Sequence, residues 1–152
     1  MEASESGRAP RFWVQDITGG PLRALTPEGV DGLFVTVAHA DYVSTQEGAD
    51  VVRLYPVDGH GPKVIRGVSD LVIGGAKESN YLYVTPDPSA IPLQVFKVNV
   101  STGQRVPFVS ILPSDPAGVV NLDRPLFTPD EKRFVVTQDR LFSTLYLASG
   151  VK

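Results

Sequence analysis

Short stretches of alternating apolar and polar residues recur along this sequence, each bounded by glycine, proline or other turn-forming residues. Alternation puts every second side chain on the same face of an extended strand, and β-branched and aromatic residues favour that conformation. No segment keeps the three- and four-residue spacing of an amphipathic helix over three turns. We therefore expect an all-β chain with almost no helix. The segments with this pattern are 33–44, 50–57, 80–85, 93–100, 132–138 and 144–149.

Three segments, 11–26, 51–67 and 94–110, share the pattern of a β-hairpin. Each has an apolar strand, a polar turn with glycine and a second apolar strand, and glycine readily takes the positive φ that such turns need. A fourth copy begins at 144–150, where the sequence ends. The turn glycines that we assign, spaced by 41 and 42 residues, are Gly20, Gly61 and Gly103.

A second repeated unit, a polar turn followed by an apolar strand, lies between the hairpins. Its best copy is TPDEKRFVV at 128–136, which lines up with AKESNYLYV at 76–84 and with VAHADYVST at 37–45. Proline presets the backbone of a tight turn and aspartate accepts hydrogen bonds from nearby backbone N–H groups. We therefore assign a structural turn role to Pro129, Asp130 and Lys132.

Four strands repeating every 40–45 residues are the signature of a β-propeller blade. The pattern predicts about three and a half blades after a flexible tail at residues 1–10, with neighbouring blades covering the faces of each sheet. The polar N-terminus has no apolar core, so we expect no secretion signal in it. The predicted units are 11–26, 33–67, 69–110 and 119–149, with longer connections at 85–92 and 111–125.

The motifs TPDEKRFVV, VRLYPVDGHGPKVI and VFKVNVSTGQRV resemble the TolB-like, WD40-like (PD40) propeller repeat. The segment from residue 91 onward resembles the C-terminal propeller region of bacterial proteins that carry a serine/threonine kinase domain. The resemblance implies a sensory or protein-binding propeller without catalytic activity. The sequence departs from the repeat at Glu131, where the pattern has glycine, and it contains no kinase motif.

Three and a half blades are fewer than a ring usually contains. An open end exposes an unpaired sheet edge and an apolar face, which favours association. We therefore expect a protein or peptide partner. The chain is either a segment of a larger ring or half of a homodimer that completes one.

Charge and cysteine content exclude several kinds of site. The net charge is −3 and the 14 basic residues are dispersed, so we expect no nucleic-acid binding. The absence of cysteine rules out disulfides, thiolate zinc sites and a thiol nucleophile. No apolar run reaches the roughly 20 residues that span a bilayer. These features leave the compartment undetermined, and no cofactor is expected.

Only His39 and Asp41 stand out as candidate ligand-facing residues. Their alternate spacing puts both side chains on one face if the segment is a strand. No nucleophile elbow or phosphate loop is present. The favoured function is a non-catalytic binding or sensory module. The alternatives are the propeller part of a hydrolase or lyase, and an orphan propeller fragment without independent activity.

Overall fold

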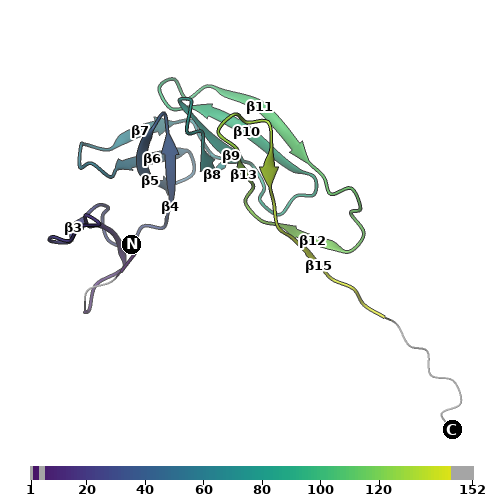
Figure 1. Cartoon of the computed structure of the whole chain (residues 1–152), viewed down its shortest axis with the longest axis horizontal. Helices are drawn as coiled ribbons and strands as arrows, with labels where there is room; N and C mark the ends of the chain where they lie inside the picture. The colour runs from purple at the N-terminus through teal and green to yellow at the C-terminus, as the bar shows by residue number, and fades with distance from the viewer. Residues whose placement is uncertain (1, 4–5, 145–152) are drawn as a thin grey trace, which may run out of the picture.

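The computed structural model describes residues 2–3 and 6–144, and these contain strands and turns but no helix (Figure 1). No segment in these ranges forms a helix with the length and hydropathy needed to cross a membrane. The strands are β1 (Glu2–Ala3), β2 (Arg11–Val14), β3 (Arg23–Ala24), β4 (Gly32–Val37), β5 (Ala40–Glu47), β6 (Val51–Pro56), β7 (Lys63–Arg66), β8 (Leu71–Gly75), β9 (Tyr81–Thr85), β10 (Leu93–Asn99), β11 (Arg105–Ile111), β12 (Val119–Leu122), β13 (Leu126–Phe127), β14 (Phe134–Val135) and β15 (Gln138–Arg140).

Two four-stranded antiparallel sheets form the centre of the molecule, with strand orders β4-β5-β6-β7 and β8-β9-β10-β11. Each sheet is a meander in which consecutive strands pair, as in a propeller blade. The predicted all-β architecture of four-stranded antiparallel repeats is confirmed. The three predicted hairpins are also confirmed, as β2–β3, β6–β7 and β10–β11.

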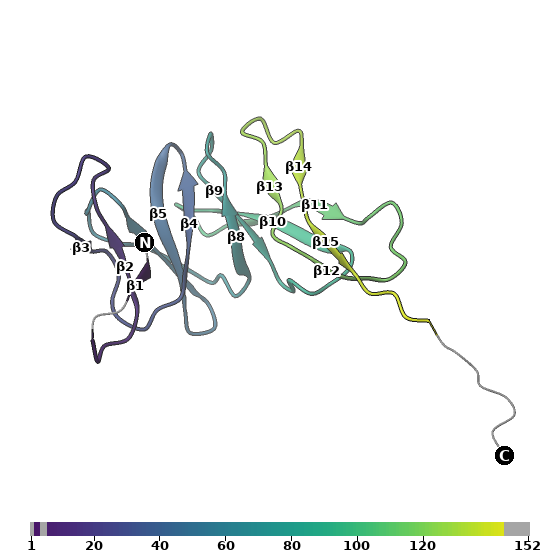
Figure 2. The ribbon, with the colours of Figure 1, turned by 60° about the horizontal axis from the view of Figure 1, so that its bottom comes forward.

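Smaller elements flank the two central sheets. Figure 2 shows the units standing side by side in chain order, from the β1-β2-β3 sheet at the left to the last hairpin at the right. Glu2–Ala3, which lie in the predicted flexible tail, pair with Phe12 and Arg11. The described residues thus form an open row of sheets.

The last unit is simpler than the predicted three-stranded one. Strand β12 pairs with β15, and β13 pairs with β14, so that residues 119–140 form one interrupted hairpin. The predicted strand at 144–149 lies outside the described residues, apart from Thr144. The alternating run at 33–44 is divided into β4 and β5 by a two-residue turn, which lies within the turn-and-strand copy predicted at 37–45.

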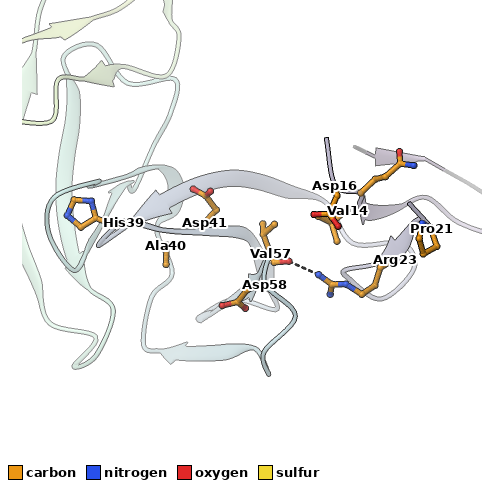
Figure 3. Close-up of a pocket in the computed structure, with 10 residues that line it drawn as sticks. Val14, Asp16, Pro21, Arg23, His39, Ala40, Asp41, Val57 and Asp58 are labelled. Carbon is orange, nitrogen blue, oxygen red and sulfur yellow. Dashed lines mark hydrogen bonds between the residues drawn. The ribbon is translucent and has the colours of Figure 1, made fainter. Parts of the chain in front are cut away.

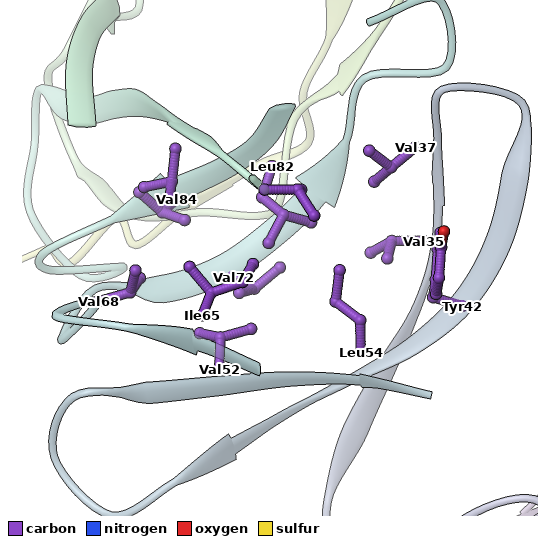
Figure 4. Packing of buried hydrophobic residues seen from close by; sticks show 12 residues of the cluster. Val35, Val37, Tyr42, Val52, Leu54, Ile65, Val68, Val72, Leu82 and Val84 are labelled. Atoms are coloured by element: carbon purple, nitrogen blue, oxygen red, sulfur yellow. The ribbon is translucent and has the colours of Figure 1, made fainter. Parts of the chain in front are cut away.

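The larger hydrophobic core lies between the two central sheets (Figure 4). The side chains of strand β9 are buried on both faces of its sheet and so join the neighbouring units. Leu82 and Val84 point into this core and are fully buried, whereas Tyr83 points to the opposite face and packs in a second core with the last hairpin. The alternation in the sequence therefore buries both faces of this sheet against two different neighbours.

Strands β4 and β8 approach each other tightly at Gly75, where β8 ends. A Cβ atom added at Gly75 would lie 2.5 Å from the carbonyl oxygen of Thr36, a distance that side chains do not reach. A residue larger than glycine would force the two sheets apart and loosen the core between them.

We expect Gly75→Ala to lower the free energy of unfolding by about 1–3 kcal/mol, because the added methyl group meets backbone. Gly61→Ala is the matched control, because a Cβ atom added there would have no neighbour within 4 Å and the φ of Gly61 is outside the positive range. The control should change stability by about 0.5 kcal/mol or less. Urea unfolding followed by circular dichroism measures both, and equal effects would contradict the close approach.

Candidate functional site

A cavity of about 580 Å³ lies between the N-terminal sheet and one end of the β4–β7 sheet (Figure 3). We call it the acidic cleft. One wall follows strand β2 and the loop into β3, and the other combines the β4–β5 turn with the end of β6. Its lining residues are Val14, Gln15, Asp16, Pro21, Arg23, His39, Ala40, Asp41, Val57 and Asp58.

The β4–β5 turn at the edge of this cleft is a tight two-residue turn. Ala38 and His39 have φ values of 48° and 62°, which non-glycine residues rarely adopt. The neighbouring β8–β9 turn holds them in place: the Ala38 N–H lies 3.2 Å from the carbonyl oxygens of Ala76 and Ser79, and the His39 N–H donates to Lys77 at 2.9 Å. These hydrogen bonds offset the backbone strain and connect the two central sheets.

The structure brings His39 and Asp41 to the same cleft but gives them different partners. His39 lies in the turn rather than in a strand, so the same-face argument from alternate spacing does not hold. Its Nε2 atom lies 3.2 Å from Glu78, and Figure 3 shows its ring turned away from Asp41. Asp41 accepts a hydrogen bond from the Thr36 hydroxyl at 2.7 Å. The two side chains therefore do not form an acid–base pair.

Acidic groups outnumber basic ones in the cleft. Asp16, Asp41 and Asp58 line it together with the Arg23 guanidinium, which donates to the Val57 carbonyl at 2.6 Å. The backbone N–H and the imidazole of His60 both contact the Asp58 carboxylate, which lowers the pKa of Asp58 and keeps it ionised. The cleft is thus suited to positively charged groups.

The glycines assigned from sequence are at turns, with one correction. Gly20 and Gly103 have positive φ values of 121° and 72°. In the β6–β7 turn, however, the positive φ of 91° belongs to Gly59 and not to Gly61. Two glycines in one short turn are interchangeable by sequence, and only the path of the backbone distinguishes them.

The turn at 128–133 has the local hydrogen bonds that its sequence predicts. The Asp130 carboxylate accepts from the Thr128 hydroxyl at 2.5 Å and from the Lys132 N–H at 3.2 Å, which lowers the pKa of Asp130. Pro129 precedes it in the same turn. Asp130 therefore accepts hydrogen bonds from two residues of its own turn.

The two longer copies of this turn are closed by the same backbone hydrogen bond, although Glu131 has a positive φ and Ser79 at the matching position does not. The N–H of Thr128 donates to the carbonyl of Arg133, as the N–H of Ala76 does to that of Tyr81, both at 2.9 Å. The alignment of 128–136 with 76–84 is therefore correct in three dimensions. The third copy, at 37–45, is shortened to the two-residue turn described above.

Sequence reasoning missed the role of Glu131. It has φ of 57°, which is the conformation that the glycine of the repeat would supply. Its carboxylate accepts a hydrogen bond from the Tyr83 hydroxyl at 2.9 Å and forms an ion pair with Lys97. Burial and the neighbouring carboxylate raise the pKa of Tyr83 well above its usual range. The sequence signal for this contact is the glutamate itself, which stands at the turn position where the repeat has glycine.

Lys97 and Glu131 connect the last hairpin to the second central sheet. The Lys97 ammonium lies 4.2 Å from the ring centroid of Phe108, and the rings of Tyr83, Phe108 and Phe127 pack together within 5.4 Å of one another. The charged pair is thus surrounded by aromatic rings and is largely shielded from solvent. Among the described residues, no group of three His, Asp or Glu side chains is placed to hold a metal ion.

Comparison with known proteins gives little further identification. No protein-family model matches the chain, and the search of curated proteins found no match. A prolyl endopeptidase of known structure is similar over 91% of this chain, with 18% sequence identity and a TM-score of 0.42. The aligned region is 22% of that protein, so this chain spans about a fifth of its length.

We expect Glu131→Gln to lower the free energy of unfolding by about 1–3 kcal/mol, because it leaves the mostly buried Lys97 ammonium without a counter-charge. In a Lys97→Met background the same substitution should cost much less, and this difference measures the coupling. Glu78→Gln, which alters an exposed carboxylate, is the control and should change little. Equal costs of Glu131→Gln in both backgrounds would show that the pair is not coupled.

Proposed function

We propose that this chain is a non-catalytic protein- or peptide-binding segment of a TolB-like propeller, and that its partner places basic side chains in the acidic cleft. The observation that carries the proposal is the excess of carboxylates in this cleft: Asp16, Asp41 and Asp58 line it together with one guanidinium, which is already bonded to backbone. The matching turns at 76–81 and 128–133 support the repeat assignment.

The geometry of the cleft is better suited to binding a partner than to catalysing a reaction. His39 is paired with Glu78, Asp41 with a hydroxyl, and Asp58 with His60, so that each group is oriented by its own local partner. The three carboxylates remain exposed to solvent. Exposed charges at a binding surface mainly accelerate encounter and select a partner of opposite charge, and salt weakens their effect.

A fluorescein-labelled hexapeptide of alternating lysine and alanine should bind in a fluorescence-anisotropy titration. Raising the ionic strength from about 0.05 M to about 0.5 M should weaken the binding. The combined substitutions Asp16→Asn, Asp41→Asn and Asp58→Asn should lower the affinity about tenfold, because they remove charge but keep the hydrogen-bond acceptors.

The matched control makes the same change in charge outside the cleft, with Asp50→Asn, Asp123→Asn and Asp139→Asn. This variant should retain the affinity of the unaltered chain. If both variants weaken the peptide equally, the peptide responds to net charge and the cleft is not its site.

The last hairpin exposes a second surface suited to a protein partner. Leu126 and Val135 are cross-strand partners in β13 and β14, and they are 72% and 71% exposed. Their neighbour Phe127 packs inward against Tyr83 and Phe108. The hairpin therefore has apolar side chains on both faces, and its outer face needs a covering sheet. We propose a second copy of this chain as that cover.

Light scattering coupled to size exclusion tests this arrangement. A mass near twice 16.4 kDa is expected for the unaltered chain. Leu126→Lys combined with Val135→Lys should return the mass to that of one chain, because two charges replace the apolar contact. Ile17→Lys, at a fully exposed position in the N-terminal loop, is the control and should not change the mass. A monomer before any substitution would contradict the proposal.

A further inference from the structure

A cavity of about 270 Å³ adjoins the acidic cleft, between the N-terminal sheet and the β4–β7 sheet. We call it the apolar pocket, because all of its lining side chains are aliphatic or aromatic. Two of them, Val14 and Val57, also line the acidic cleft, so the two spaces are neighbours. The full lining consists of Phe12, Trp13, Val14, Leu25, Phe34, Val43 and Val57.

One wall of the pocket is the face of the β4–β7 sheet that is turned away from the core between the central sheets. Phe34 and Val43 are cross-strand partners in β4 and β5 and therefore point to the same face. The residues next to them, Val35 and Tyr42, point to the other face and are part of the central core. Val43 is buried, but Phe34 is 58% exposed. A contiguous apolar surface with an exposed ring is typical of a binding site.

The opposite wall comes from strand β2. Phe12 and Val14 alternate along this strand and so point to the same face. At one end of the pocket the Phe12 ring packs over Gly32, where an added Cβ atom would lie 3.2 Å from it. At the other end the Arg23 guanidinium donates to the Val57 carbonyl at 2.6 Å (Figure 3). This hydrogen bond joins the two walls where the apolar pocket meets the acidic cleft.

A carboxylate of the cleft stands at a fixed spacing from the apolar wall. Asp41 and Val43 are separated by one residue in β5, so their side chains point to the same face about 7 Å apart. The Val57 N–H donates to the Asp41 carbonyl at 2.9 Å, which places a residue of the pocket directly beside Asp41. Because Asp41 is exposed, a ligand in the pocket has a negative charge within reach.

The volume and the lining of the pocket fit a phenyl ring. An apolar cavity of roughly 150 Å³ is large enough to hold benzene, and this one has about 270 Å³. Aromatic rings pack favourably against one another, and Phe12 and Phe34 supply two of them. No lining side chain offers a hydrogen-bond acceptor, so a hydroxyl or a charged group would leave water here without gaining a side-chain partner. Phenylalanine therefore fits better than tyrosine or lysine.

We propose that the partner of the acidic cleft is a peptide segment in which phenylalanine stands two residues from a lysine or arginine. The phenyl ring fills the apolar pocket, and the basic side chain binds the carboxylates of the cleft. Side chains two residues apart in an extended segment point to the same face at about 7 Å, which matches the spacing of Val43 and Asp41. The inference rests on the proposed peptide-binding function and adds the apolar residue that selects among basic partners.

Three hexapeptides, blocked at both ends so that only the lysines are charged, test this pairing by isothermal titration calorimetry with the full chain. KAFAKA has phenylalanine two residues from each lysine. KAAAKA has the same charge without the ring, and KKAAAF has the composition of KAFAKA with the ring moved away from the lysines. KAFAKA should bind at least about tenfold more tightly than either of the others, which corresponds to about 1.4 kcal/mol.

The outcomes separate the apolar pocket from the acidic cleft. If KAFAKA and KAAAKA bind equally and salt weakens both, the cleft binds basic peptides but the pocket is not used. If KKAAAF binds as tightly as KAFAKA, the ring adds general hydrophobicity and the proposed spacing is wrong. If no peptide binds, the proposed function fails together with this inference.

Phe34→Ser should remove most of the difference in affinity between KAFAKA and KAAAKA, because it takes away the exposed ring of the pocket. Phe142→Ser is the matched control, since Phe142 is 76% exposed and lies outside the pocket, and this variant should keep the difference. A Phe34→Ser chain that still prefers KAFAKA about tenfold would show that the peptide ring binds elsewhere.

Intermolecular nuclear Overhauser effects locate the ring without any substitution. With an isotope-labelled chain and unlabelled KAFAKA, cross-peaks are expected between the phenyl protons and the methyl groups of Val14, Leu25 and Val57. Cross-peaks to Leu126 or Val135 in their place would show that the peptide covers the last hairpin, and would overturn the assignment to the apolar pocket.

Discussion

Sheets with apolar side chains on both faces impose the main constraint on this chain, because such a sheet is stable only between two neighbours. In β9, Leu82 and Val84 are buried against the preceding sheet and Tyr83 is buried against the last hairpin. Each sheet in the row likewise needs a neighbouring unit to cover each of its apolar faces. In the last hairpin this need is not met at Leu126 and Val135, whose side chains are exposed.

The sheets are also joined where their turns meet, and these contacts hold strained backbone. Ala38 and His39 adopt positive φ while bonded to the β8–β9 turn, and Glu131 does so while its carboxylate is bonded to Tyr83 and Lys97. In each case contacts with a neighbouring sheet maintain a conformation that the residue alone disfavours. The positions of the turns therefore depend on the stacking of the sheets.

The acidic cleft follows from this stacking, because it lies where the N-terminal sheet meets the end of the β4–β7 sheet. Its lining residues come from several strands and turns and not from one motif. The groups proposed to bind a partner there are exposed carboxylates.

The sequence alone determined the all-β class, the four-stranded repeats, the three hairpins and the turn at Asp130, because alternation and turn chemistry are local. It also singled out His39 and Asp41 as candidate ligand-facing residues, and both line the acidic cleft. The sequence could not show that Gly59 and not Gly61 has the positive φ, or that His39 pairs with Glu78.

Contacts between residues far apart in the chain were decided only by the tertiary structure. The contact of Glu131 with Lys97 spans 34 residues, and that of Glu131 with the Tyr83 hydroxyl spans 48. Local patterns carry no information on how one sheet is positioned on the next, since that depends on side-chain packing across the whole interface. Packing therefore decided which residues of the last hairpin contact the second central sheet.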